Sequence, residues 1–173
     1  MEDCHVILVD ENDVALGTME KLEAHRKALL HRAVSVFIFN TSGSWLLQQR
    51  ARNKYHSNGL WTNTCCTHPY PGESNLEAAQ RRLKEEMGMQ CSLREIFHFT
   101  YKDALDNGFT EYELDHVFIG ISDETPKINP DEVMDYRYIS LAGLKKELLQ
   151  HPENFTVWFR KIVNISESKL TNL

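Results

Sequence analysis

The sequence lacks the long apolar segments that a membrane helix needs. No apolar run in its 173 residues approaches the roughly 18 residues that span a bilayer. Glycine and proline number only 8 and 5, which excludes a collagen-like or low-complexity chain. The first ten residues carry acidic side chains and no basic cluster, so no signal or transit peptide is predicted. We therefore expect a soluble, cytoplasmic protein that makes no membrane contact.

Positive charge is also in short supply. Lys and Arg total 19 against 25 Asp and Glu, which gives a formal net charge of -6. Proteins that bind nucleic acid non-specifically are normally basic, so no nucleic-acid partner is expected. Taken alone, the same charge would also disfavour an anionic ligand.

Cysteine occurs at four positions, Cys4, Cys65, Cys66 and Cys91. The adjacent pair Cys65 and Cys66 is a poor basis for a disulfide framework, and no export signal places the chain in an oxidising compartment. Free thiols are therefore predicted.

What remains is an ordinary globular composition, 42% hydrophobic and 25% charged. The chain has no internal repeat and no Ser/Gly linker, so residues 1–173 are predicted to form a single domain. No feature calls for an oligomer, and a monomer is expected. Strands are predicted at 6–9, 33–39, 45–49, 93–101, 112–122 and 133–139, and helices at 19–30, 74–87, 141–150 and 155–165. Such a mixture indicates an α/β (α+β) fold, a sandwich in which helices flank a mixed sheet.

The clearest element is the helix that follows Ser74. Ser74 and Glu77 have the spacing of a capping box, and Gly88 is a typical helix terminator. A core-facing stripe is predicted at Leu76, Ala79, Leu83 and Met87. The segment 52–71 has no such period and is predicted to be a long irregular loop, a kind of segment that often carries function.

Arg82 and Glu86 are neighbours on this helix, four residues apart, and could form a plain surface salt bridge. However, Glu73 and the run Arg81-Arg82-Leu83-Lys84-Glu85-Glu86-Met87-Gly88-Met89 resemble the Nudix box. Two positions depart from that motif: Thr67 replaces its opening glycine, and Arg82 replaces the first helix glutamate. In Nudix hydrolases these glutamates bind the divalent metals that activate water. An arginine cannot ligate a metal, so the resemblance implies the Nudix fold without its full hydrolytic apparatus.

The loop sequence Trp-Thr-Asn-Thr-Cys-Cys-Thr-His-Pro, residues 61–69, offers a second signal. A Cys two residues before a His can be a buried inert thiol, a nucleophile or part of a metal site. A structural zinc site would need a second ligand pair nearby, which is missing. The string closely resembles the loop of type I isopentenyl-diphosphate isomerases, in which the cysteine two before His-Pro is catalytic. The resemblance implies this role for Cys66.

A third signal is the acidic run Glu111, Glu113 and Asp115. On a strand these carboxylates share a face, where they repel one another unless a metal, a base or a proton relieves them. A solvated strand face is the alternative. The same isomerase family has two glutamates here, one a metal ligand and the other both a ligand and the catalytic acid/base. They correspond to Glu111 and Glu113.

The resemblance further implies a divalent ion held by His25, His31, His68, Glu111 and Glu113. Zn²⁺, Mn²⁺ and Mg²⁺ all suit such a donor set. Because His25 and His31 lie six residues apart, about 240° around a helix, the helix must break between them. The other histidines have no comparable support: His5, His56, His98, His116 and His151.

The resemblance to the isomerases also implies residues that would bind the substrate. A diphosphate would be held by Lys21, Arg50, Lys54 and Arg82, and Glu86 would hold Mg²⁺ against it. Tyr101 and Trp158 match aromatic residues beside the reacting carbon skeleton, although both could equally be core residues. The implied activity is isomerisation of isopentenyl diphosphate to dimethylallyl diphosphate by Cys66 and Glu113. A Nudix hydrolase acting on nucleoside diphosphates and a non-catalytic metal- or diphosphate-binding module are the alternatives.

Overall fold

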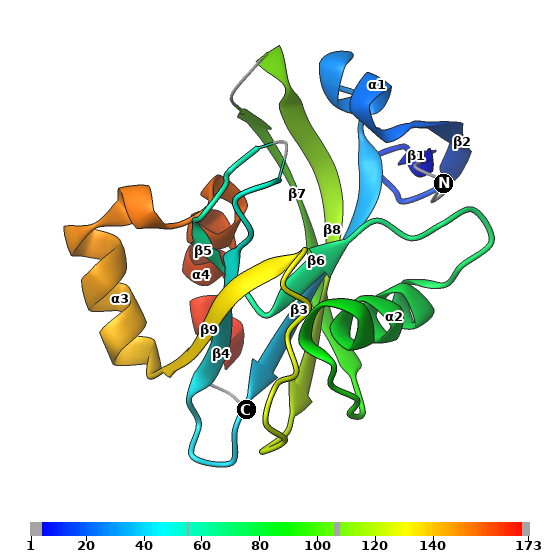
Figure 1. Cartoon of the computed structure of the whole chain (residues 1–173). Helices are drawn as coiled ribbons and strands as arrows, with labels where there is room; N and C mark the ends of the chain where they lie inside the picture. Colours follow the sequence, from blue (N-terminus) through cyan, green and yellow to red (C-terminus); the bar gives the residue numbers. More distant parts are fainter. Residues whose placement is uncertain (1–4, 55, 106–107, 171–173) are drawn as a thin grey trace.

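A computed structural model describes residues 5–54, 56–105 and 108–170 (Figure 1). Within them, nine strands form one mixed sheet. The strands are β1 His5–Val9, β2 Ala15–Glu20, β3 His31–Phe39, β4 Trp45–Arg50, β5 Trp61–Thr62, β6 Cys65–Thr67, β7 Arg94–Ala104, β8 Thr110–Ile121 and β9 Val133–Ile139. The helices are α1 Lys21–Arg26, α2 Asn75–Met87, α3 Leu141–Gln150 and α4 Val157–Leu170, with a 3₁₀ turn at Pro152–Asn154. This architecture confirms the predicted α+β fold.

Strand β3 lies at the centre of the sheet. Along one edge it runs parallel to β8, in a register that starts at His31 opposite Glu113. Along the other edge it pairs antiparallel with β6, where Ser35 lies opposite Cys66. The three strands therefore bring residues distant in sequence to one end of the sheet.

Helices cover both faces of the sheet, with α2 on one side and α3 and α4 on the other (Figure 1). Because side chains alternate along a strand, β3 contributes to two cores. Phe37 packs with Trp45 and Phe159 on the α4 side. Val36 packs with Leu83 on the α2 side.

Helix α2 forms as predicted. The Ser74 side chain accepts a hydrogen bond from the Glu77 backbone, the capping box is complete, and Gly88 ends the helix in the left-handed conformation with φ 64°. One stripe residue was predicted wrongly, because Leu76 is 40% exposed. The small side chain of Ala78 is buried instead.

The predicted helix 19–30 is shorter in the structure. Met19 and Glu20 belong to β2 and pair with β1. The Glu20 side chain then caps α1, and the chain turns at Ala28, which has φ 50°. The helix thus breaks between His25 and His31, as predicted for two histidines that would bind one ion.

Other boundaries differ less. Helix α4 starts at Val157 rather than at 155 and continues beyond 165. The short strands β5 and β6 lie within the segment predicted to be irregular. The described cysteines Cys65, Cys66 and Cys91 are free thiols, whereas Cys4 lies outside the described residues. Among the described helices, none has both the length and the apolar composition to cross a membrane.

Candidate active site

One pocket collects most of the predicted site residues, although they come from strands, helices and loops. It is lined, among others, by Lys21, Arg50, Lys54, Cys66, His68, Arg82, Glu86, Tyr101, Glu111, Glu113 and Trp158. Two further predicted residues, His25 and His31, are fully buried beside it. Cationic side chains, carboxyl side chains and a thiol thus line one pocket.

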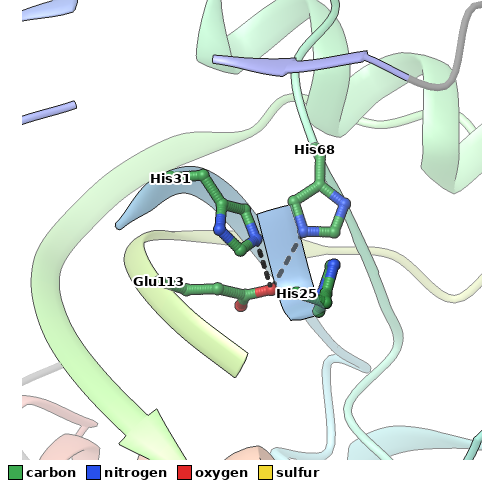
Figure 2. A group of neighbouring side chains, drawn as sticks. All are labelled: His25, His31, His68 and Glu113. Carbon is green, nitrogen blue, oxygen red and sulfur yellow. Dashed lines mark hydrogen bonds and ion pairs between the residues drawn. The ribbon is translucent and has the colours of Figure 1, made fainter. Parts of the chain in front are cut away.

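Four of the predicted ligands converge (Figure 2). The ligand atoms of His25, His31, His68 and Glu113 all lie within 4.8 Å of one another. His68 Nε2 is 2.9 Å from Glu113 Oε1, and His31 Nε2 is 3.6 Å from the same oxygen. Figure 2 shows these two nitrogens directed at that oxygen.

Backbone carbonyls fix the tautomers of two of these histidines. His25 Nδ1 is 2.6 Å from the Lys21 carbonyl oxygen, and His31 Nδ1 is 2.8 Å from that of Leu29. A carbonyl only accepts, so each Nδ1 carries the hydrogen and each Nε2 keeps its lone pair. Within the described residues, both Nε2 atoms are buried and have no hydrogen-bond partner. Orphaned imidazole nitrogens oriented by carbonyls fit a divalent metal ion.

The ionisation states of these side chains also favour metal binding. Burial lowers the pKa of His25, and it lowers the pKa of His68 to about 3. Burial opposes the ionisation of Glu113, but His31 and His68 outweigh it and hold the pKa of this carboxyl well below its usual range. Neutral imidazoles and an ionised carboxylate are the forms that bind metals.

Glu111 does not belong to the group of four converging ligands. The Tyr101 hydroxyl connects it to Glu113 by hydrogen bonds, since Tyr101 Oη lies 2.9 Å from Glu111 Oε2 and 2.7 Å from Glu113 Oε2. Burial and the charge of Glu113 raise the pKa of Glu111 well above its usual range. Tyr101 therefore bridges an ionised carboxylate and a carboxyl that favours its protonated form.

The two adjacent cysteines point to different places. Cys65 is fully buried and packs in the core beneath α2. Cys66 is half-buried and lines the pocket. Burial raises the pKa of the Cys66 thiol to about 12, so it carries its proton at neutral pH.

Carboxylates form ion pairs with the cationic side chains of the pocket. Arg82 Nη2 lies 2.5 Å from Glu86 Oε1 and 2.6 Å from Glu132 Oε2, and Lys54 also pairs with Glu132. Gln48 donates to Glu86 Oε2 at 2.6 Å. Burial raises the pKa of the Glu86 carboxyl, and the Arg82 guanidinium opposes that rise.

Among the residues that the sequence did not indicate, His56 and Glu132 line the pocket, and the buried Gln48 contacts Glu86. His56 is 5% exposed, its Nε2 lies 3.8 Å from Glu111 Oε1, and its ring packs edge-on against Trp158. Burial lowers its pKa to about 3. Only position along the chain could have indicated them, since His56 follows Lys54 in the loop predicted at 52–71 and Gln48 alternates with Arg50 along β4.

The comparisons with known proteins bear on this site. The NUDIX domain family matches residues 29–159. An isopentenyl-diphosphate Delta-isomerase of Pectobacterium atrosepticum is 56% identical over 155 residues, which cover 90% of this chain and 87% of the relative. An isopentenyl-diphosphate Delta-isomerase 2 of Photorhabdus laumondii is 50% identical over 159 residues, which cover 92% of this chain and 90% of the relative.

The chain belongs to the NUDIX isopentenyl-diphosphate Delta-isomerases. The crystal structure of DR0079 from Deinococcus radiodurans shares the fold, with a TM-score of 0.80 and 20% identity, covering 94% of this chain and 99% of that one.

The Nudix box of this isomerase departs from the motif at two positions, Thr67 and Arg82. Glu73 and Arg81 keep a two-pronged ion pair, with Nε–Oε1 at 2.7 Å and Nη2–Oε2 at 2.9 Å. Thr67 replaces the opening glycine without strain, because the described non-glycine residues with positive φ are Asp13, Ala28 and Ser57. Arg82 changes the charge of the site, since it places a guanidinium where the motif has a carboxylate.

Proposed function

We propose that this protein interconverts isopentenyl diphosphate and dimethylallyl diphosphate by a 1,3-allylic proton shift. The observation that carries the proposal is the 56% identity to a curated isopentenyl-diphosphate Delta-isomerase along almost the whole chain. The pocket supports it, because a protonated thiol, four carboxyl side chains and several cationic side chains line it.

In this reaction one group protonates the alkene, which gives a tertiary carbocation-like species. A second group removes a proton from the other end of the allyl unit, so the proton count is unchanged. Cys66 and Glu113 are the proposed pair. They reach the pocket from β6 and β8, which lie on opposite edges of β3, since Ser35 pairs with Cys66 on one side and Val117 on the other. The reaction direction decides which group acts first.

Neighbouring residues support this pair. The Tyr101 hydroxyl hydrogen-bonds Glu113 and fixes its carboxyl. Trp158 would stabilise positive charge on the substrate through its ring face. Both aromatic residues are buried, at 6% and 3% exposure, and they help to keep water from a strongly acidic intermediate.

The residues present fit two divalent cations. His25, His31, His68 and Glu113, with Glu111 beside them, would hold one ion, for which Zn²⁺, Mn²⁺ and Mg²⁺ are all suitable. Glu86 would hold Mg²⁺ together with the diphosphate. When bound, these cations supply positive charge that neutralises the buried carboxylates and the substrate.

The diphosphate itself would be held by Lys21, Arg50, Lys54 and Arg82, which all line the pocket. The net charge of -6 is therefore a poor guide to the ligand, because much of the acidity sits in groups that bind cations. The free thiols of the described cysteines fit a reducing compartment such as the cytoplasm.

The test is incubation with isopentenyl diphosphate and Mg²⁺ in D₂O, followed by mass spectrometry. Deuterated dimethylallyl diphosphate is expected. Cys66→Ala and Glu113→Gln should each reduce its formation by orders of magnitude with an unchanged circular dichroism spectrum, whereas Cys91→Ala should not. Phosphate release without isomerisation would identify a hydrolase, and substrate binding without deuterium incorporation a binding module. Turnover by Cys66→Ala at the wild-type rate would refute the proposed mechanism.

A further inference from the structure

A second group of metal-ligating side chains lies away from the pocket. The ligand atoms of Glu95, His98 and His116 all lie within 4.8 Å of one another. His116 is three residues beyond Glu113 on β8, so the two side chains point to opposite faces of the strand. None of the three residues lines the pocket described above.

A β-bulge creates this group. Glu95 pairs with Phe118 and His98 pairs with His116, and the register shifts by one residue between Glu95 and Phe97. In a regular strand, residues three apart point to opposite faces. The extra residue at the bulge places Glu95 on the same face as His98, beside His116. Bulges commonly redirect a side chain in this way near functional sites.

His116 is oriented from both sides. Its Nδ1 lies 2.7 Å from Glu95 Oε1, and its Nε2 lies 3.1 Å from Asp13 Oδ2. A carboxylate behind the distal nitrogen is the arrangement that orients metal-binding histidines, because it holds the hydrogen on that nitrogen and leaves the other one for the metal.

Asp13 is itself fixed in place. Arg32 Nε lies 2.7 Å from Asp13 Oδ1, and Arg32 Nη2 donates to the Asp13 carbonyl at 2.8 Å. Asp13 has φ 63°, a conformation that aspartate tolerates better than most residues. The turn between β1 and β2 thus presents a carboxylate to His116, which is 5% exposed.

We propose that Glu95, His98 and His116 form a second divalent transition-metal site, with Asp13 as the positioning residue behind His116. Two imidazoles and one carboxylate suit Zn²⁺ and related ions, with water completing the coordination. Glu95 and His98 are exposed, so an ion can enter from solvent. The ion replaces the hydrogen between His116 Nδ1 and Glu95, and that proton is released to the buffer.

Zinc binding tests this proposal independently of isomerisation. Metal-free protein is titrated with Zn²⁺ by calorimetry, and bound zinc is counted by mass spectrometry. We expect the wild type to bind one zinc more than His98→Ala. Glu95→Gln should weaken that extra site at least about 100-fold, and Asp13→Asn should weaken it about 10- to 100-fold. Both altered ligands are exposed, so the fold should persist.

His151→Ala is the matched control, since His151 is also an exposed histidine paired with a glutamate, Glu153. It should bind zinc as the wild type does. All variants should keep wild-type isomerase activity when saturated with metal. Equal zinc stoichiometry in the wild type and His98→Ala would overturn the proposal, and His116 would then serve only in a hydrogen-bond network with Asp13 and Glu95.

Discussion

Arg82 Nη2 lies 2.5 Å from Glu86 Oε1, and the two residues are four positions apart on α2. This contact puts a guanidinium beside the carboxylate that we propose binds Mg²⁺. A diphosphate bound there would meet both a fixed positive charge and a metal ion. The substitution of arginine for the first helix glutamate of the Nudix box thus favours anion binding over the activation of water.

Glu86→Gln should therefore raise the Mg²⁺ concentration needed for half-maximal rate by about tenfold or more, because an amide is a weaker magnesium ligand than a carboxylate. Arg82 keeps its contact with Glu132 in this variant, so the fold should persist. Initial rates measured across a Mg²⁺ series give the result. Glu85→Gln is the control, because Glu85 is exposed and lies 3.3 Å from Arg82. Identical Mg²⁺ curves for the two variants would contradict the assignment of Glu86.

Tyr101→Phe should lower kcat by about 10- to 100-fold and leave KM for isopentenyl diphosphate nearly unchanged. The variant removes the hydrogen bonds to Glu111 and Glu113 but keeps the ring and its packing. Steady-state kinetics with a circular dichroism spectrum give the measurement. Tyr112→Phe, which alters a half-buried tyrosine on the other face of β8, should behave as the wild type. A Tyr101→Phe variant that changes only KM would place this hydroxyl on the substrate rather than on the carboxylates.

Local patterns were sufficient to predict much of the fold. Strand Val133–Ile139 has the predicted bounds, and α2 has the predicted caps. The helix expected at 19–30 failed because pairing with a neighbouring strand outweighed local periodicity: Met19 lies opposite Val6. That pairing depends on tertiary structure, which a local window does not contain.

The site residues also divide into those that the sequence indicated and those that depend on tertiary structure. Resemblance supplied residues that meet in one pocket, but no sequence pattern indicated that His56 would pack against Trp158. Alternation correctly put Glu111 and Glu113 on one face of β8. It also separates them by about 6.6 Å along the strand, which explains why Glu111 lies outside the tight group around His31.

Gly88→Ala should destabilise the protein well beyond the cost of an unfavourable φ. Gly88 has φ +64°, and an added Cβ would lie 2.5 Å from the backbone oxygen of Lys127. Gly43→Ala is a matched control, because Gly43 has φ +78° and nothing within 4 Å. We expect about 1–2 kcal/mol for Gly43→Ala and a larger loss for Gly88→Ala, measured by urea unfolding. Equal losses would show that the contact with Lys127 relaxes at no cost.

Alkylation of Cys66 should respond to pH in an unusual way. Burial raises the pKa of this thiol to about 12, so only a small fraction is thiolate at neutral pH, and the thiolate is the species that reacts. Below the raised pKa, each pH unit increases the thiolate fraction about tenfold. Iodoacetamide should therefore modify Cys66 slowly at pH 7, and the rate should still be rising at pH 9, where an ordinary thiol of pKa about 8.5 approaches its plateau.

Cys66 is half-buried and lines the pocket, so the reagent can reach it. Peptide mapping by mass spectrometry at several pH values gives the site-specific rate, and Cys66→Ser identifies the peptide. A rate that levels off near pH 8 would mean that the thiol ionises normally. In that case Cys66 would be less suited to hold the proton that the proposed shift requires.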